Sequence, residues 1–390
     1  MDYKKIQKYL KEHALDGWLL ADFHGRNDIA VKVLELVGFL SRRSFCFIPA
    51  EGEPVTLVNP VEQDRFEHLP GKIIACKGYR RLEAELQKVL GGCKKVAMEY
   101  SFLGRLPYIG LVEAGTIELV RSFGIEIVSS ADLVAHFQAR LDHRQVASHK
   151  KAARLLVDIK TKAFAYITGS LQNDTTVTEF DVCRFILDEF KMNGLTTEFG
   201  PNCSVDAHAG DPHYDPSEQN SAVIKKGQLI LIDLWAKEPA EYGVYGDITW
   251  MAFAGTKDEI PERYVRMFAV LVRARDAAVA YLKEHIGRGE VYGADVDDAC
   301  RKVVEDAGYG DHFTHRTGHS ITSAEHGPGP NIDNLETEDK RKLMPGHLFS
   351  IEPGIYYEDC GFRTEIDVLI TDTGVEVTTL PLQTVITALF

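Results

Sequence analysis

The chain has 390 residues, of which 45% are hydrophobic and 26% charged, and its formal net charge is −14 at pH 7. The length predicts two domains, and the acidic balance argues against nucleic-acid binding, because a phosphate backbone would be repelled. The apolar run "LILIDLWA" (229–236) is far too short to cross a membrane. Seven cysteines without a C-x-x-C pair fit reduced thiols, and the N-terminal segment has no signal-peptide core, so we expect a cytoplasmic protein.

The first part of the chain alternates short apolar runs with helix-like segments. Residues 80–90 predict an amphipathic helix, and six runs predict strands at 17–23, 43–50, 53–59, 72–76, 94–100 and 125–130. This pattern predicts a small α/β domain. A long helix begins within 139–171, and "RLDHRQ" (140–145) is the predicted boundary, which divides the chain into domains 1–143 and 144–390.

The second part contains an internal repeat. "GQLILID" (227–233) matches "GHLFSIE" (346–352), with an acid six residues after the glycine in both, and the next strand of each half carries Asp247 or Glu365 followed by Ile. The repeat distances are 119 residues for the first acids and 118 for the second. A helix pair precedes each hairpin, at 152–171 with 177–194 and at 265–284 with 291–310. The C-terminal domain is therefore predicted to be α+β, with two α-α-β-β halves related by a pseudo-twofold axis.

The repeated acids lie where carboxylates are costly. Asp233 interrupts a strand that is apolar on both faces, and Glu352 does the same in "LFSIEPG". A salt bridge with a buried Arg or Lys explains one such acid, but four acids on two facing hairpins repel one another unless cations hold them. Oxygen-rich ligation with one or two imidazoles favours Mn²⁺ or Co²⁺, with Zn²⁺ and Fe²⁺ as alternatives.

Between the two hairpins, "GDHFTHRTGHSITSAEHGPG" (310–329) contains four histidines: His312, His315, His319 and His326. A polar surface loop is one interpretation, and a metal or acid–base site is the other. The carboxylates on either side favour the second, because this loop can supply a nitrogen ligand and proton-transfer groups. We interpret His312 and His315 as loop residues or neighbours of the site.

Taken in order, these motifs resemble the pita-bread metallopeptidases, a family that includes prolidase, aminopeptidase P and methionine aminopeptidase, with creatinase as a non-metal relative. The resemblance covers nearly the whole chain and is nearest to Xaa-Pro dipeptidase. It implies a pita-bread C-terminal domain preceded by a smaller creatinase-type N-terminal domain. It also implies a two-metal site whose ligands are Asp233, Asp247, His319, Glu352 and Glu365.

The resemblance also implies catalytic and substrate-binding residues. His213 in "PHYDP" and His326 match the two active-site histidines, and Glu352 is the expected proton-transfer group. Arg363, two residues before Glu365, is predicted to contribute to substrate binding, and it either orients that carboxylate or forms a structural salt bridge. The tyrosines at 356 and 357 are interpreted as packing residues.

Three positions depart from the family pattern. Trp250 stands where an Arg is usual, Arg316 replaces a glycine, and Pro330 occupies the position of the prolidase Arg that binds the dipeptide's terminal carboxylate. Arg316 is the predicted replacement, unless it pairs with a nearby acid. Arg26 is a second candidate if a partner subunit closes over the site.

The predicted function is a dinuclear exopeptidase that cleaves the bond before proline, mainly in Xaa-Pro dipeptides, through attack by a metal-bridged hydroxide. The alternatives are an Xaa-Pro aminopeptidase acting on longer peptides, a lyase or C–N hydrolase of non-peptide substrates, and a binding module of the same fold. The five intact ligand positions argue against the last. The expected partners are a small peptide and a second copy of the chain, with no nucleic acid and no membrane.

Overall fold

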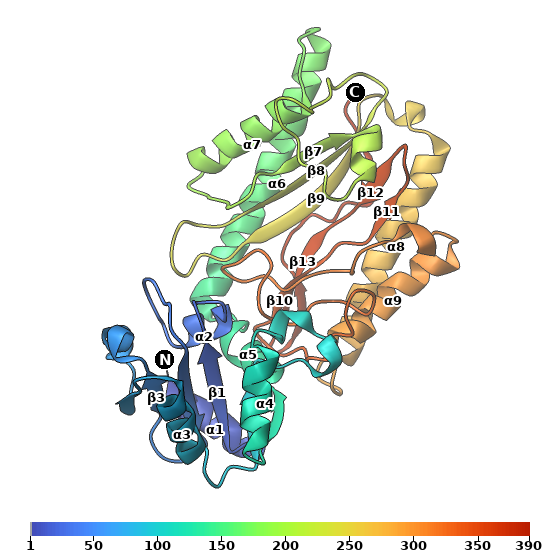
Figure 1. Ribbon diagram of the computed structural model, residues 1–390. Helices are drawn as coiled ribbons and strands as arrows, with labels where there is room; N and C mark the ends of the chain where they lie inside the picture. Colours follow the sequence, from blue (N-terminus) through green and yellow to red (C-terminus); the bar gives the residue numbers. More distant parts are fainter. Residues whose placement is uncertain (1) are drawn as a thin grey trace. The chain divides into compact units, whose positions relative to one another are not determined.

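The computed structural model describes residues 2–390, which form two compact units, one ending at Gln138 and one spanning Ala139–Phe390 (Figure 1). The domain boundary expected from the sequence lies five residues further on, where helix α6 begins. No helix within residues 2–390 combines the length and the apolar character needed to traverse a bilayer.

The N-terminal unit is built on a six-stranded sheet of order β4-β3-β2-β1-β5-β6. β1 and β2 pair antiparallel, as do β2 and β3, whereas the β3–β4, β1–β5 and β5–β6 pairs are parallel. All six predicted strands are present, and the strands are β1 (Gly17–Asp22), β2 (Ser44–Pro49), β3 (Val55–Val58), β4 (Lys72–Ala75), β5 (Lys95–Met98) and β6 (Glu126–Ser129).

Helices cover both faces of this sheet, which explains why β1 is buried along its whole length. Because side chains alternate along a strand, Trp18 and Leu20 pack with α1, α2 and α5, whereas Leu19 packs with α3 and α4. The helices are α1 (Tyr3–Glu12), α2 (Asp28–Val33), α3 (Tyr79–Val89), α4 (Ala114–Ser122) and α5 (Ala131–Gln138), with short 3₁₀ turns at Pro60–Phe66, Phe102–Gly104 and Pro107–Ile109.

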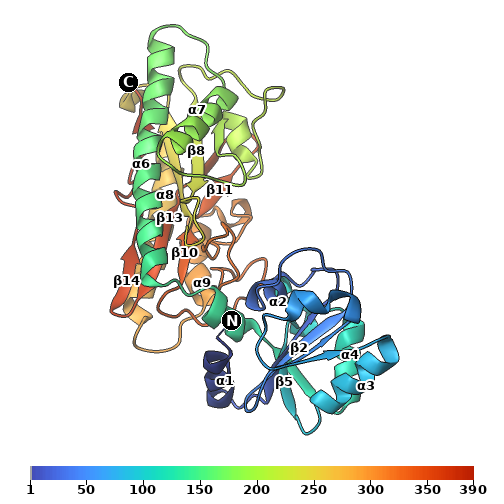
Figure 2. The ribbon, with the colours of Figure 1, turned by 90° about the vertical axis from the view of Figure 1, so that its left-hand side faces the viewer.

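The C-terminal unit has the predicted two halves, each a helix pair followed by strands (Figures 1 and 2). The first half contains α6 (His143–Gln172), α7 (Glu179–Met192), β7 (Asn202–Val205), β8 (Leu229–Ala236) and β9 (Gly246–Phe253). The second contains α8 (Glu262–His285), α9 (Gly293–Asp306), β10 (Leu348–Ile351), β11 (Gly354–Tyr356), β12 (Gly361–Arg363), β13 (Ile366–Thr371) and β14 (Gly374–Val377). Three 3₁₀ turns (Asp206–Gly210, Lys257–Glu259, Gly310–His312) and β15 (Thr387–Ala388) complete the unit. The α+β prediction is confirmed.

The first hairpin lies between the two helix layers. β15, β9, β8 and β7 form one sheet, in which β8 and β9 pair antiparallel. Ile232 and Ile248 point toward α6 and α7, whereas Leu231 and Met251, on the opposite face, pack with α8 and α9.

Helix α6 starts with a capping box, in which the Asp142 carboxylate accepts from the Gln145 N–H and Gln145 Oε1 accepts from the Asp142 N–H.

The second hairpin differs from the first because its strands break at the acids. β10 pairs with β13 as far as Ile351 opposite Ile366, and β11 pairs with β12 from Gly354 opposite Arg363. Glu352 and Glu365 lie in the gap between these pairings. Their N–H groups bond elsewhere, to Thr317 O at 2.7 Å and to Thr249 O at 3.3 Å.

Candidate metal centre

Strand alternation directs the first two acids to the same face of the sheet. In the β8–β9 register, Asp233 lies opposite Thr249, and Trp235 lies opposite Asp247. Residues two apart on paired strands share a face, so both carboxylates point away from α6 and α7. The β-strand geometry therefore brings together two acids that are fourteen residues apart in the chain.

Hydrogen bonds between the two hairpins bring the second pair of acids to the same place. The N–H of Asp247 donates to Asp367 Oδ2 at 2.9 Å, and Thr249 Oγ1 donates to Glu365 Oε2 at 2.8 Å. Asp367 is fully buried. These contacts join β9 to the start of β13, so the predicted convergence of the two halves is present.

His319 is held beside β10. Its N–H donates to Ser350 Oγ at 2.9 Å, and its carbonyl accepts from the Ser350 N–H at the same distance. The preceding Gly318 is required here, since a Cβ at that position would lie 1.9 Å from the carbonyl oxygen of Ser350. The Nε2 of His319 lies 3.6 Å from Asp247 Oδ2 and 3.5 Å from Glu352 Oε1.

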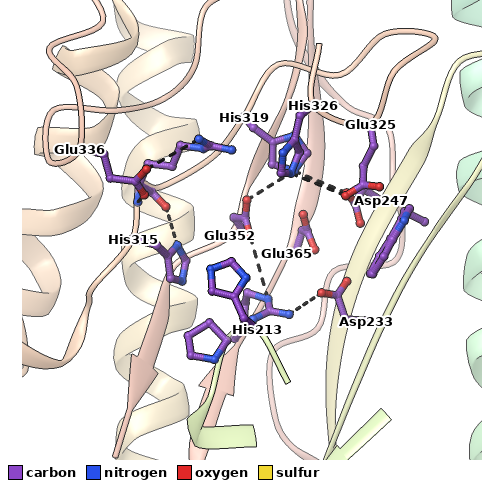
Figure 3. A pocket seen from close by; sticks show the side chains of 14 residues that line it. His213, Asp233, Asp247, His315, His319, Glu325, His326, Glu336, Glu352 and Glu365 are labelled. Atoms are coloured by element: carbon purple, nitrogen blue, oxygen red, sulfur yellow. Dashed lines mark hydrogen bonds and ion pairs between the residues drawn. The ribbon is translucent and has the colours of Figure 1, made fainter. Parts of the chain in front are cut away.

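All five predicted ligands line one pocket of about 390 Å³ (Figure 3). Asp247, His319 and Glu365 form a compact group within it, with one potential ligand atom from each within 4.8 Å of the others. All three residues are buried. The remaining predicted ligands, Asp233 and Glu352, lie around this group (Figure 3).

The carboxylates are not satisfied by the protein alone. Among the described residues, Asp233 Oδ1 and Asp247 Oδ1 are buried oxygens without a hydrogen-bond partner. The pocket lining holds six carboxylates and two guanidiniums, a formal excess of four negative charges. A buried, unpaired carboxylate costs several kcal/mol, so the donor set fits divalent cations, and two of them would balance the formal charge.

The pKa values agree with a site built for cations. Burial, reinforced by the other acids, raises the pKa values of Asp247 and Glu365 well above their usual range. Burial also raises the pKa of Glu352 to about 7, although Arg363 and Arg316 oppose this shift. The pKa of His319 is well below its usual value, mainly because of burial, so its imidazole is neutral and free to ligate.

Arg363 pairs with Asp233 rather than with Glu365. Its Nε donates to Thr249 Oγ1 at 3.0 Å and lies 4.0 Å from Glu352 Oε2, and its Nη1 donates to the Tyr356 hydroxyl at 3.0 Å. Its hydrogen-bonded connection to Glu365 runs through the Thr249 hydroxyl. The guanidinium is buried and well paired, and its predicted role in substrate binding stays a prediction.

The two predicted catalytic histidines line the pocket from different loops. His326 packs its ring 4.2 Å from that of His319, and its Nε2 lies 3.6 Å from Glu325 Oε1 (Figure 3). His213 is on the loop between β7 and β8, and its N–H donates to Asp211 Oδ1 at 2.9 Å.

The candidates for binding a substrate carboxylate occupy different places. Arg316 lines the pocket, its N–H donates to Glu336 Oε1 at 3.0 Å, and its Nη1 lies 3.8 Å from Glu336 Oε2. Pro330 is buried and is not part of the pocket lining. Arg26 belongs to the N-terminal unit, where its guanidinium lies 5.5 Å from the Phe23 ring.

Trp250, the third departure from the family pattern, points away from the site. It lies on the face of β9 that packs with α6, and Lys160 Nζ lies 3.5 Å from its ring centroid. Trp250 thus contributes to packing, and its side chain does not line the pocket.

Sequence reasoning missed several pocket residues. Trp235, Glu325 and Glu336 line the pocket, and Trp235 could have been inferred because it shares the Asp233 face of β8. His315 also lines it, with Nε2 2.8 Å from the Tyr356 hydroxyl, so Tyr356 does more than pack. No local pattern indicates the other contacts, which depend on how the loop folds.

Comparisons with known proteins agree with this geometry. The sequence pattern of metallopeptidase family M24 matches residues 147–372. An uncharacterized peptidase of Staphylococcus saprophyticus is 30% identical over 387 residues, covering 96% of this chain and 98% of the relative. Dipeptidase PepE from Mycobacterium ulcerans shares the fold with a TM-score of 0.73 and 21% identity, covering 99% of this chain and 98% of that one. The prolidase from Pyrococcus horikoshii OT3 does so with a TM-score of 0.64 and 22% identity, covering 98% and 99%.

Proposed function

Because the chain belongs to metallopeptidase family M24, we propose that it is a dinuclear exopeptidase that hydrolyses the bond before proline, mainly in Xaa-Pro dipeptides. The observation that carries the proposal is the convergence of four carboxylates and one neutral imidazole on a single pocket in which two carboxylate oxygens lack partners. The names of the two similar structures, a dipeptidase and a prolidase, support the substrate class.

Two divalent cations, Mn²⁺ or Co²⁺ before Zn²⁺ or Fe²⁺, would be held by Asp233, Asp247, His319, Glu352 and Glu365. When bound, such cations polarise the scissile carbonyl and lower the pKa of a water molecule. The protein contributes the orientation of the carboxylates. Thr249 fixes Glu365, and Arg363 fixes Asp233, so each enters the pocket in one defined direction.

Glu352 is the proposed proton carrier. It accepts from Ser350 Oγ at 3.1 Å through Oε1, while its Oε2 lies 4.0 Å from Arg363 Nε. Burial raises the pKa of Glu352 to about 7 in the metal-free protein. A carboxylate in this place can take a proton from the attacking water and return it to the leaving nitrogen. Glu352 lies at the break between β10 and β11, with Oε1 3.5 Å from His319 Nε2.

His213 and His326 complete the proposed machinery. Both residues line the pocket, and both come from loops rather than from the strands that carry the acids. Their rings can therefore contact a peptide bound in the pocket. We assign them to hydrogen bonds with the carbonyl oxygen, as negative charge develops on it, and with the leaving imino nitrogen.

A dipeptidase must also neutralise the terminal carboxylate of its substrate. Arg363 is already engaged by Asp233, Tyr356 and Thr249. Arg316 is the other guanidinium in the pocket, and its ion-pair distance to Glu336 is 3.8 Å. A guanidinium can bind both oxygens of a carboxylate, which makes Arg316 the proposed anchor.

The second candidate function is an aminopeptidase that removes Xaa from Xaa-Pro-Yaa peptides. The observation that favours it is the burial of Pro330 outside the pocket, at the position where the resemblance implies an arginine for a free terminal carboxylate. We also propose a cytoplasmic homodimer that binds neither nucleic acid nor membrane, in keeping with the formal charge of −14.

One assay tests the proposal. Purified protein loaded with Mn²⁺ or Co²⁺ is offered an Xaa-Pro dipeptide, its C-terminal amide, an Xaa-Pro-Yaa tripeptide and an Xaa-Ala dipeptide. Preference for the Xaa-Pro dipeptide supports the first candidate, and preference for the tripeptide supports the second. Equal hydrolysis of Xaa-Ala, or no hydrolysis of any peptide, would overturn the proline-directed function.

A further inference from the structure

Residues 206–222, the first part of the segment between β7 and β8, form a loop that carries His213 into the pocket. The His213 ring makes no hydrogen bond to any other residue within 2–390. A histidine used for proton transfer or hydrogen bonding must be held in place by its surroundings. The anchor of this loop is Glu179, the first residue of helix α7, whose side chain is fully buried.

Glu179 binds both ends of the loop. Its Oε1 accepts from the N–H of Val205 at 2.8 Å, just before the loop, and its Oε2 accepts from the N–H of Ala222 at 2.7 Å, at the loop's end. The Glu179 N–H donates in turn to the Ala222 carbonyl at 3.1 Å. One carboxylate thus fixes the span that the loop must bridge.

Glu179 also binds the middle of the loop, next to His213. The Tyr214 hydroxyl donates to Glu179 Oε2 at 2.7 Å, and His208 Nδ1 lies 2.9 Å from the same oxygen. The rings of Tyr214 and His208 stack with centroids 4.2 Å apart. Tyr214 is further held by its backbone, which bonds to the side-chain amide of Asn202 and to the Asp211 carbonyl.

His213 therefore lies between two fixed points. On one side its own N–H is bound by the Asp211 carboxylate, and on the other the adjacent Tyr214 is tied to Glu179. We propose that Glu179 is a positioning residue for His213, which acts by ordering the loop rather than by touching the substrate. This inference rests on the role of His213 in the proposed function.

A carboxylate is needed at this position, and an amide cannot replace it. Both oxygens of Glu179 accept from backbone N–H groups, so either orientation of a glutamine would turn its NH₂ toward one of these donors. Glu179→Gln should leave one N–H unsatisfied and loosen the loop. The metal ligands lie on other elements, so metal content should not change.

The test compares Glu179→Gln, His213→Ala and the double variant. The matched control is Glu99→Gln in the N-terminal unit, whose carboxylate is also fully buried and accepts from Trp18, Asn27 and Ser130. We expect Glu179→Gln to lower kcat by roughly tenfold or more, a fraction of the 10²–10⁴-fold typical of a lost acid–base group, with KM nearly constant. In the His213→Ala background the same change should cost less than about twofold. Glu99→Gln should leave kcat unchanged.

Hydrogen exchange supplies a readout that does not require substrate. Glu179→Gln should accelerate amide exchange in residues 206–222 by roughly tenfold or more, with the strands β8 and β9 unaffected. Tyr214→Phe, which removes only one of the bonds to Glu179, is the second variant in case Glu179→Gln does not fold. It should show the same pattern with smaller effects.

The outcomes separate the two proposals. If His213→Ala is slow but Glu179→Gln has normal turnover or unchanged loop exchange, the positioning role fails and the proposed function stands. Equal losses from Glu179→Gln in both backgrounds would mean that it acts independently of His213, and would also overturn the inference. If His213→Ala has normal turnover, the role of His213 in the proposed function fails and the positioning role fails with it.

Discussion

Glu99 in the N-terminal unit and the pocket acids in the C-terminal unit are buried in opposite ways. In the N-terminal unit Glu99 is fully buried, but Trp18 Nε1 and Asn27 Nδ2 each donate to it at 2.7 Å and Ser130 Oγ at 3.0 Å. In the C-terminal unit, Asp233 and Asp247 each keep one buried oxygen without a partner. A carboxylate surrounded by neutral donors is a structural group, whereas a group of acids with unused oxygens indicates a cation site.

The largest expected effect comes from removing a carboxylate on the unsatisfied side of this comparison. Asp247→Asn should lower the metal content and reduce the rate of hydrolysis by more than roughly 100-fold. Even changes to residues that hydrogen-bond to metal ligands lower metal affinity or activity by about 10–100-fold. The fold should survive, because the amide is less costly to bury than the charge. Metal analysis, kinetics and circular dichroism measure these effects. Unchanged metal stoichiometry together with full activity would contradict the assignment of Asp247 as a metal ligand.

The histidines that line the pocket should behave differently from the acids. His213→Ala and His326→Ala should retain the metal but lose roughly 10²–10⁴-fold in kcat, the usual worth of a positioned acid–base or oxyanion group. Metal content and steady-state kinetics on an Xaa-Pro dipeptide provide the measurement. Near-normal turnover in both variants would make these histidines structural loop residues.

The two guanidiniums of the pocket sharpen the comparison further. Arg316→Ala should cost about 2–5 kcal/mol in transition-state binding for an Xaa-Pro dipeptide and little for the same peptide with an amidated C-terminus. The measurement is kcat/KM for both substrates. Equal effects on the two would exclude Arg316 as the carboxylate anchor and favour the aminopeptidase.

Stability of the metal-free protein should depend on pH because of the acids in the pocket. Burial raises the pKa of Glu352 from its ordinary value to about 7 in the folded state. The folded state therefore binds the proton more tightly than the unfolded state, and its stability falls as the pH rises from about 4.5 to about 7, on the order of 3 kcal/mol for this group. Urea titrations at pH 5 and pH 7.5 measure the fall. Added metal should remove it, and a pH-independent stability without metal would contradict the proposed clustering.

The smallest effect is expected on the satisfied side. Glu99→Gln replaces one hydrogen-bond acceptor by a donor and should cost about 1–3 kcal/mol of stability. Burial raises the pKa of Glu99, so its contribution to the stability of the folded protein decreases as the pH rises through that raised pKa. The glutamine variant should lack this pH dependence. Metal content and kcat should stay at their wild-type values. A loss of metal in this variant would contradict the distinction between Glu99 and the pocket acids.

The sequence by itself determined the fold class and four acids of the pocket, Asp233, Asp247, Glu352 and Glu365. A repeat of 119 and 118 residues, acids in strands that are apolar on both faces and the alternation of β8 and β9 are periodic features that need no coordinates. The likeness to family M24, confirmed by the match over 147–372, added His319, His213 and His326. That these residues bind metal or act in catalysis stays a prediction.

Tertiary structure alone decided which partners these side chains have. Arg363 pairs with Asp233, which is 130 residues away in the chain, although Glu365 lies only two residues away. Trp250 replaces a charged residue of the family pattern yet packs with α6, and Glu179 holds a loop whose far end is 43 residues away. Periodicity in the sequence specifies the face on which a strand residue lies. The contacts of loops and buried charges depend on segments brought together only when the core packs, which is why they could not be inferred from local pattern.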